Sequence, residues 1–443
     1  MGHCKVRGET PSLTSALVMN FDPELEQFWD EAAIEGELKR VFDICNGCRR
    51  CYNLCPSFSD LFVRLDREEV DGDAEKLKLT DLKSVTDLCY QCKLCFNHCP
   101  YTPPHRWEVD FPRLMLRAKA AQTRRAGRTL QDRFLGQVDA IGRLGSLLAP
   151  LMNWLNRNPL NRWLMEKALG IHRQRILPNY ASQTFRRWFD HRASRQIPAA
   201  TRKVVLFYTC SVNFNEPEVG RACVRVLEKN GVEVRCPEQR CCGMPFLDGG
   251  DIDEAKMNAG ANVASLDFWV ARGYDVVVPG PTCSYMLKQE YPWLLKSDAA
   301  RAVAARSFDI CEYLMALHGE GRLDTRFVRG AGKIAYQMPC HLRAQNIGYK
   351  SRDLMQLIPG TTVQVFEKCA AIDGTWGLKQ RYFDLSLKVA EPLLSGIRET
   401  KPDLTVSDCL LAGLQIQQGT NVKPLHPVQV LERAYGLAGA GNL

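Results

Sequence analysis

Residues 45–56 read CNGCRRCYNLCP, and residues 89–100 read CYQCKLCFNHCP. Both follow the pattern CxxCxxCxxxCP, in which three closely spaced cysteines surround one [4Fe–4S] cubane and the fourth, just before proline, reaches another cluster. The pattern therefore predicts two clusters that exchange their fourth ligands. The first set is Cys45, Cys48, Cys51 and Cys99, and the second is Cys89, Cys92, Cys95 and Cys55.

Zinc is the alternative for these cysteines, because CxxC pairs also form zinc sites. Two identical four-cysteine runs that each end in CP favour iron–sulfur clusters instead. The 33 residues between Cys55 and Cys89 exceed what a compact bacterial ferredoxin needs. Upstream, the stretch DPELEQFWDEAAIEGELKRVF at 22–42 predicts a helix that starts with a cap and an early proline. We expect residues 1–112 to form a helical two-cluster module.

The composition sets the class of protein. A chain of 443 residues predicts two or three folded units, and 45% hydrophobic with 24% charged residues is ordinary for a globular protein. The 19 cysteines are the unusual feature. The amino terminus MGHCKVRGETPSL has no basic region followed by an apolar run, so we expect a cytoplasmic protein whose cysteines bind metal.

Residues 113–200 form a basic helical linker in this interpretation. Between Arg113 and Arg195 stand 17 Lys or Arg and four acids, whereas the whole chain carries +8. Apolar residues recur there at helical spacing, at Leu135, Val138, Ile141, Leu144, Leu148 and Leu151. Asp139 and Arg143 break any bilayer-spanning run. The helix either lies peripherally on the inner face of a membrane or packs on its own protein; nucleic acid is not an expected partner.

From about Lys203 short apolar runs alternate with helical segments, which predicts parallel sheets with crossover helices. Four of the predicted strands deliver a cysteine to the carboxyl edge of a sheet, where open α/β sheets bind ligands. These are Cys210, Cys283, Cys340 and Cys409.

The cysteine spacing repeats along this half. Cys210 to Cys241 is 31 residues and Cys340 to Cys369 is 29, and the following intervals to Cys283 and Cys409 are 42 and 40. The spacing indicates an internal duplication, with domains at 201–330 and 331–443. RCCGMPFLDG at 240–249 corresponds to KCAAIDGTWG at 368–377, so Ala370 and Ala371 replace Cys242 and Gly243.

The chain resembles the proteins with paired CCG domains, which include the B subunit of heterodisulfide reductase, the iron–sulfur subunit of glycolate oxidase and the C subunit of anaerobic glycerol-3-phosphate dehydrogenase. Besides the two cysteine runs, the resemblance rests on LPNYASQTFRRWF (177–189), YTCSVNFNEPEVG (208–220), RCCGMP (240–245), TCSYMLKQEYP (282–292), PCHLRAQNIGY (339–349) and GTWGLK (374–379). It implies electron transfer from a flavoprotein or other donor toward quinones, and in the related reductase disulfide cleavage at a CCG-bound cluster.

The resemblance also implies cofactor ligands in the CCG domains. In the first copy, Cys210, Cys241, Cys242 and Cys283 match a ligand set for a third cluster, although Met286 stands where a fifth cysteine is expected. In the second copy only Cys340, Cys369 and Cys409 remain, because Ala370 and Ala412 replace two thiols. That site would hold an open cubane, or zinc with His341, or nothing. We expect Gly374 and Gly377 to serve the turn, and Cys4, Cys223, Cys236 and Cys311 to be structural.

The sequence thus predicts an α+β multidomain protein with an α-helical two-cluster module followed by duplicated α/β CCG domains. The expected function is that of an oxidoreductase subunit, which passes electrons between a partner such as a flavoprotein dehydrogenase and an acceptor, a quinone or a protein. No GxGxxG fingerprint follows a strand, so a separate subunit would handle a two-electron substrate. One alternative is an enzyme that reduces a disulfide or small acceptor at the first CCG site. Another is a scaffold whose clusters only stabilise the fold.

Overall fold

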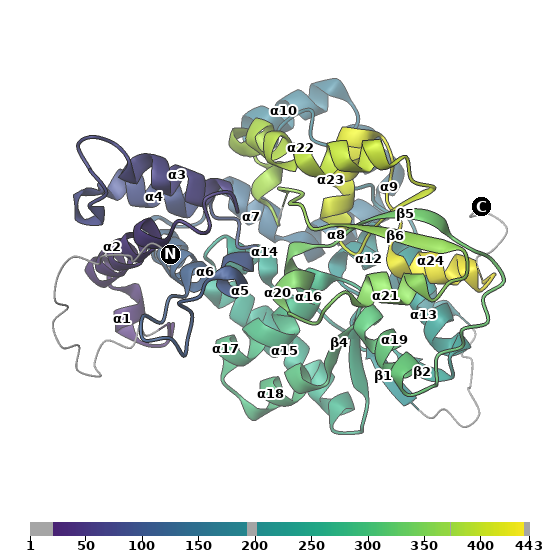
Figure 1. The fold of residues 1–443 in the computed structure, drawn as a ribbon. Helices are drawn as coiled ribbons and strands as arrows, with labels where there is room; N and C mark the ends of the chain where they lie inside the picture. The colour runs from purple at the N-terminus through teal and green to yellow at the C-terminus, as the bar shows by residue number, and fades with distance from the viewer. Residues whose placement is uncertain (1–20, 193–201, 373, 438–443) are drawn as a thin grey trace. The chain divides into compact units, whose positions relative to one another are not determined.

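The computed structural model describes residues 21–192, 202–372 and 374–437 (Figure 1). The chain forms two compact units. One comprises Met1–Thr129 with Phe246–Ile252, and the other comprises Leu130–Pro245 with Asp253–Leu443.

The first unit is helical, as predicted. Its elements are α1 (Glu26–Trp29), α2 (Glu31–Cys48), α3 (Pro56–Leu65), η1 (Ala74–Lys76), α4 (Leu79–Leu88), α5 (Leu94–His98) and α6 (Phe111–Ala126). The stretch expected to be helical over 22–42 is helical from Glu26 onward, with Leu25 rather than Asp22 at the N-cap position. It divides at Asp30, whose side chain accepts the N–H of Ala33 and caps α2, and α2 then continues to Cys48.

An apolar core holds the cysteine loops of this unit. Phe42 on α2, Phe58 and Leu61 on α3 and Phe111 on α6 are all buried together. The rings of Phe58 and Phe111 stack with centroids 4.4 Å apart. Because Cys55 immediately precedes α3 and Cys89 immediately follows α4, the packing of these helices fixes where both thiols lie.

The second unit contains two parallel sheets, which confirms the α/β expectation (Figure 1). The first has the order β2-β1-β3-β4 and the second β6-β5-β7. Their strands are β1 (Arg202–Leu206), β2 (Val232–Arg235), β3 (Asp275–Val278), β4 (Ser307–Asp309), β5 (Gly332–Gln337), β6 (Thr361–Phe366) and β7 (Leu404–Ser407). In register, Val204 pairs with Asp275 and Ile334 pairs with Leu404.

Helices connect and cover these strands. In the first repeat they are α12 (Cys210–Phe214), α13 (Pro217–Lys229), α15 (Ile252–Val270), α16 (Pro281–Tyr285), the π-helical turn η2 (Met286–Glu290), α17 (Tyr291–Leu295), α18 (Asp298–Ala305) and α19 (Ile310–Gly319). In the second they are α20 (Cys340–Ala344), α21 (Lys350–Gln356), η3 (Trp376–Leu378), η4 (Gln380–Tyr382), α22 (Phe383–Thr400), α23 (Leu410–Thr420) and α24 (Pro427–Ala434). The chain also forms α14 (Met244–Asp248), of which Phe246–Asp248 belong to the first unit.

The two repeats share one core. Val204 and Val277 from the first sheet, Ile334 and Val406 from the second, and Leu431 from α24 are fully buried in the same cluster. The carboxyl ends of β1, β3, β5 and β7 each lead directly to a cysteine. Burial of this core therefore positions the predicted ligands of both copies.

The segment before β1 belongs to the second unit from Leu130 onward. It forms α7 (Leu130–Gly136), α8 (Val138–Leu147), α9 (Ala149–Leu155), α10 (Pro159–Leu169) and α11 (Phe185–His191). Helix α8 packs on α12, where a Cβ on Gly142 would lie 2.2 Å from the ring of Phe214. Among the described residues, no helix is both long and apolar enough to cross a bilayer.

Candidate functional site

The structure brings together the four cysteines of the first predicted cluster. Burial, followed by the charges of Cys51, Cys99 and Cys48, raises the pKa of Cys45 well above its usual value. These thiols therefore lie beside one another, with Cys99 contributed by the second cysteine run. Their crowding fits a metal cluster, because a cationic core removes the repulsion that four bare thiolates would suffer.

The second set is assembled in the same exchanged manner. Burial raises the pKa of Cys55, and the charges of Cys92 and Cys89 raise it further. Cys95 is buried as well, and its pKa is raised by burial and then by the charges of Cys92, Cys89 and Cys55. The structure thus places Cys55 with the later run and Cys99 with the earlier one, which is the arrangement a two-cluster ferredoxin requires.

Several polar groups lie beside Cys89, and the cysteine motif does not indicate them. The amide of Gln91 donates to Cys89 Sγ at 3.5 Å and to the carbonyl of Pro112 at 3.1 Å. Lys93, which is buried, donates to Gln91 Oε1 at 2.7 Å, and Lys119 Nζ donates to the carbonyl of Cys89. The charges of Lys119 and Lys93 oppose the effect of burial on the pKa of Cys89. Two lysines therefore favour a negatively charged cluster at this site.

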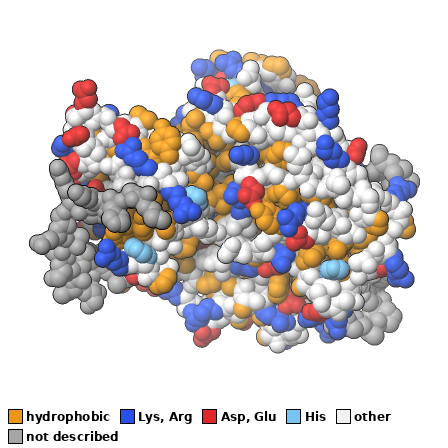
Figure 2. All heavy atoms as spheres, in the orientation of Figure 1, with side chains coloured by type: hydrophobic (Ala, Val, Ile, Leu, Met, Phe, Trp, Pro, Cys, Tyr) orange, Lys and Arg blue, Asp and Glu red, His pale blue; other side chains and the backbone are white. Residues whose placement is uncertain are grey.

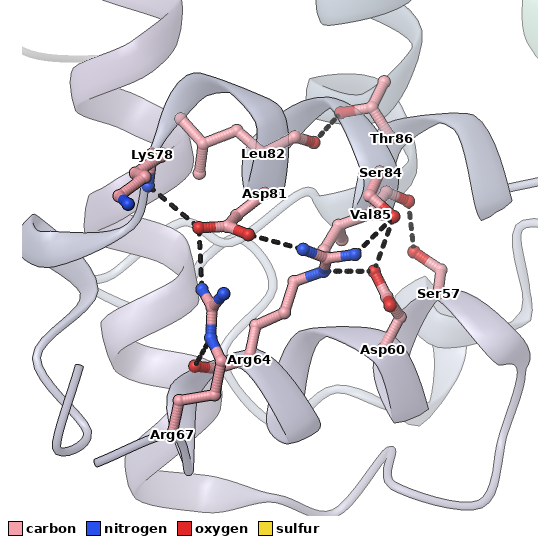
Figure 3. Close-up of polar contacts among 10 residues, drawn as sticks. All are labelled: Ser57, Asp60, Arg64, Arg67, Lys78, Asp81, Leu82, Ser84, Val85 and Thr86. Atoms are coloured by element: carbon pink, nitrogen blue, oxygen red, sulfur yellow. Dashed lines mark hydrogen bonds and ion pairs between the residues drawn. The ribbon is translucent and has the colours of Figure 1, made fainter. Parts of the chain in front are cut away.

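An ion-pair network locks together the two helices that present Cys55 and Cys89 (Figure 3). The buried Asp81 on α4 accepts from Arg64 and, at 2.7 Å, from Arg67 Nη2. Burial alone would raise the pKa of Asp81, but hydrogen bonds from Arg67, from the N–H of Lys78 and from Arg64 lower it overall. Ser57 adds a hydrogen bond of 2.8 Å from α3 to the carbonyl of Val85.

The first CCG copy gathers its four cysteines in a buried group. Cys241 accepts hydrogen bonds from the thiols of Cys210 and Cys242, which lowers the pKa of Cys241 and raises those of the two donors. Cys242 also hydrogen-bonds with Cys283. Gly243 has φ +93°, a conformation that glycine adopts without strain, and it allows the chain to turn after the paired cysteines. Four converging thiols fit an iron–sulfur cluster.

A residue of the basic segment reaches this site. Oδ2 of Asp139, in the first turn of α8, accepts the backbone N–H of Cys241 at 2.7 Å. Burial raises the pKa of Asp139 and the bond from Cys241 opposes that effect. In the sequence Asp139 is only a charge that interrupts an apolar stripe. No local pattern links it to a cysteine 102 positions later.

A cavity of about 510 Å³ opens beside the same cysteines. Its walls include all four first-copy cysteines, apolar side chains of the second repeat such as Leu410 and Leu414, and apolar side chains from α7 to α10. The side chains from α7 to α10 are Phe134, Leu135, Val138, Ile141, Leu144, Met152, Leu155, Met165 and Leu169. The volume lies in the range of small-molecule sites.

The second copy is different. Cys409 lines the cavity, and neither Cys340 nor Cys369 is among its lining residues. Ala370, Ala371 and Ala412 lie in an apolar cluster against which Cys369 and Cys409 pack. A Cβ on Gly377 would lie 2.5 Å from the Cα of Ile372, and Gly374 has φ +53°, so both glycines are required by the turn.

His341 lies in the first turn of a helix. Strand β5 ends at Gln337, and Cys340 and His341 begin α20. The ring of His341 is buried, with Nδ1 2.9 Å from Thr282 Oγ1 in the first copy. This contact directs the imidazole toward the neighbouring repeat.

The cysteines expected to be structural are buried where the structure describes them. These are Cys223, Cys236 and Cys311, whereas Cys4 lies outside the described residues. Cys311 Sγ is 3.9 Å from Oδ1 of the buried Asp408, which also accepts from Tyr336 and Ser351. This polar group links α19 of the first repeat to the residue that follows β7 of the second.

Comparison with known proteins agrees with this architecture. Residues 38–125 match the family described as "Citrate utilization protein B Fer4-like domain", and residues 204–288 match the "Cysteine-rich domain" family, CCG. Lactate utilization protein A of Oceanobacillus iheyensis is 29% identical over 244 residues, which are 52% of this chain and 96% of that protein. The C subunit of anaerobic glycerol-3-phosphate dehydrogenase from Escherichia coli K12 is 30% identical over 398 residues, 89% of this chain and 98% of that protein. The chain therefore belongs to the CCG-domain iron–sulfur proteins, in the family of the C subunit of anaerobic glycerol-3-phosphate dehydrogenase.

Proposed function

We propose that this chain is an electron-transfer subunit that takes electrons from a partner dehydrogenase and delivers them to a quinone at the first CCG site. When bound, two [4Fe–4S] clusters in the helical unit and a third iron–sulfur cluster at Cys210, Cys241, Cys242 and Cys283 would supply one-electron transfer. The relatives include a subunit of a glycerol-3-phosphate dehydrogenase, which supports a dehydrogenase as the partner.

The apolar cavity beside the CCG cysteines is the observation that carries this proposal. A lipophilic ring and the beginning of its tail can be buried there, against Ile141 and Met165, while the ring lies near the thiols. Charged groups in the wall are few, namely Glu216, Asp408 and Lys423. The lining thus favours a lipophilic acceptor over the polar disulfide that the reductase alternative requires.

The outer side of the same helices supports contact with a membrane. Of the 18 large hydrophobic residues that are exposed in the described part of the chain, seven lie between Leu147 and Leu164. Leu147 is 79% exposed and Trp154 is 59% exposed, and the basic residues Arg143 and Arg157 are exposed beside them in the sequence. Figure 2 shows Lys and Arg, together with some Asp and Glu, next to hydrophobic side chains at the top of the view, where α10 and α22 lie. This composition suits an interface with anionic lipid, from which a quinone would enter.

Iron, acid-labile sulfide and zinc should be measured per chain after anaerobic purification, for the wild type and for a Cys241→Ala, Cys242→Ala double variant. We expect about twelve irons that fall to about eight, because only the CCG cluster depends on these two ligands. About eight irons in both proteins would refute the third cluster.

Quinone reduction tests the acceptor. With electrons supplied by dithionite-reduced protein, Met152→Trp should fill the cavity and slow reduction of a short-chain naphthoquinone about tenfold without loss of iron. Met257→Trp is the matched control, because Met257 is 56% exposed and is not a lining residue. Equal rates in both variants would exclude the cavity as the quinone site.

A further inference from the structure

Asp139 connects helix α8 to the ligand loop of the first CCG site. The backbone N–H of Cys241, a predicted cluster ligand, donates a hydrogen bond to Oδ2 of Asp139 at 2.7 Å. Asp139 also raises the pKa of Cys210 through its charge, which places the carboxylate close to a second ligand. A negatively charged side chain therefore lies against the site from outside the CCG repeats.

Close packing fixes the position of this carboxylate. Three and six residues along α8, Gly142 faces the ring of Phe214 and Gly145 faces the ring of Tyr180. A Cβ at these positions would come within 2.2 Å and 2.5 Å of ring carbons, so only glycine lets α8 approach this closely. On the following helix, α9, Asn153 Oδ1 accepts the N–H of the same Tyr180 at 2.8 Å. The helix is thereby held against the cysteine-bearing segment rather than loosely tethered to it.

Two physical effects of Asp139 act in the same direction. Its charge disfavours the arrival of an electron at the neighbouring site, since reduction adds negative charge. Hydrogen bonds from backbone N–H groups to cluster sulfurs favour the reduced state. Because the N–H of Cys241 donates to Asp139 instead of to a sulfur, this stabilisation of the reduced state is lost. No ion pair with Asp139 occurs in the described part of the chain; the cations that act on it, Arg143 and Arg240, are exposed.

We propose that Asp139 is a positioning residue that holds the Cys241 loop and keeps the reduction potential of the first CCG site low. This inference rests on the proposed cluster at that site. The basic segment then has a second role besides membrane contact. Asp139, on the side of α8 that faces the first CCG site, would lower the electron affinity of that site.

The test is an anaerobic redox titration of the third cluster, followed by electron paramagnetic resonance at a mildly alkaline pH. Asp139→Asn keeps an acceptor oxygen for the Cys241 N–H and removes the charge. We expect the equilibrium constant for one-electron reduction to rise at least tenfold, which corresponds to about 59 mV. Asp139→Glu, which restores the charge, should return the constant to within about threefold of the wild type.

Asp298→Asn is the matched control, because its side chain is 98% exposed and it removes the same charge from the same unit. An unchanged titration in D139N with twelve irons retained would overturn the inference and leave the proposed function intact. Loss of the third cluster from D139N, with D298N fully loaded, would reduce Asp139 to a structural anchor and overturn the proposed effect on potential. A wild type with only about eight irons would overturn both proposals together.

Discussion

His426 Nε2 lies 3.1 Å from the carbonyl oxygen of Pro279 and joins the second repeat to the connection between β3 and α16, the helix that carries Cys283. The other ring nitrogen, Nδ1, accepts the N–H of Val428 at 3.1 Å and caps α24. The two contacts require a neutral ring with its proton on Nε2. Burial lowers the pKa of His426 to about 3, and the bond to Pro279 only partly opposes this shift.

Acid should therefore weaken this connection between the repeats. The unfolded chain binds a proton at His426 below a pKa of about 6.5, whereas the folded chain does not until about 3, so stability is lost as pH falls through that window. The slope contributed by this residue approaches ~1.4 kcal/mol per pH unit. His426→Asn, which retains a capping acceptor and a donor, should flatten the pH dependence of the second unit's melting temperature. His191→Asn, at an exposed position, is the control and should leave that dependence unchanged. If H426N followed the wild-type curve, protonation of His426 would not be what weakens the folded protein in acid.

Asp81→Asn should destabilise the helical unit. The side chain of Asp81 is 4% exposed and pairs with two arginines, so its neutralisation leaves Arg64 and Arg67 without their shared counter-charge. We expect a loss of about 1–3 kcal/mol in the free energy of unfolding, because Arg64 keeps Asp60 as a partner and the two arginines are partly exposed. Denaturant unfolding of the cluster-loaded protein, followed through iron–sulfur absorbance, would measure it.

Asp87→Asn is the control for this prediction, because Asp87 pairs with Lys83 one turn away on α4, where the lysine is 58% exposed. Such a pair contributes at most about 0.5 kcal/mol. Equal effects of the two substitutions would show that the Arg64–Asp81–Arg67 network does not hold α3 against α4.

The cysteine pattern predicted much of the architecture, because ligand spacing and parallel-strand ends are local features. Ligand spacing predicted the exchange of Cys55 and Cys99 between the two cysteine runs. The strand ends predicted that Cys210 follows β1 and that Cys283 follows β3. The break of the first helix at Asp30 could also have been anticipated, since aspartate is a favourable cap.

The contacts of Asp139 and His341 could not be predicted from local pattern. Asp139 meets Cys241 because Gly142 allows α8 to approach α12 and Gly145 allows it to approach Tyr180. His341 meets Thr282 because the two repeats share a core. Periodicity identifies an apolar face of a helix, but it does not identify the partner that covers the face. Of the predicted stripe, Leu135, Val138, Ile141 and Leu144 line the wall of the cavity, whereas Leu148 and Leu151 are exposed.

Gly142→Ala should disrupt that wall. The added methyl group would lie 2.2 Å from the ring of Phe214, so α8 or α12 must move, at a cost of about 1–3 kcal/mol. Gly36→Ala is the matched control, because Gly36 lies inside α2 with nothing within 4 Å of the added atom. That change should be neutral or stabilising by up to about 1 kcal/mol. Thermal melting of both variants distinguishes them; equal melting temperatures would mean that α8 is not tightly packed.

Contact with lipid should depend on the outer residues of α8 and α9. Leu147 and Leu151, which are 79% and 50% exposed, would each enter the interface, so the double variant Leu147→Glu, Leu151→Glu should bind anionic vesicles at least tenfold more weakly in a flotation assay. Binding of the wild type should fall as salt is raised, because the charges of Arg143 and Arg157 are screened. Val328→Glu alters an equally exposed apolar residue elsewhere in the same unit and should bind normally. If the wild type failed to float with vesicles at low salt, the exposed leucines and tryptophans of these helices would have to face a protein partner instead.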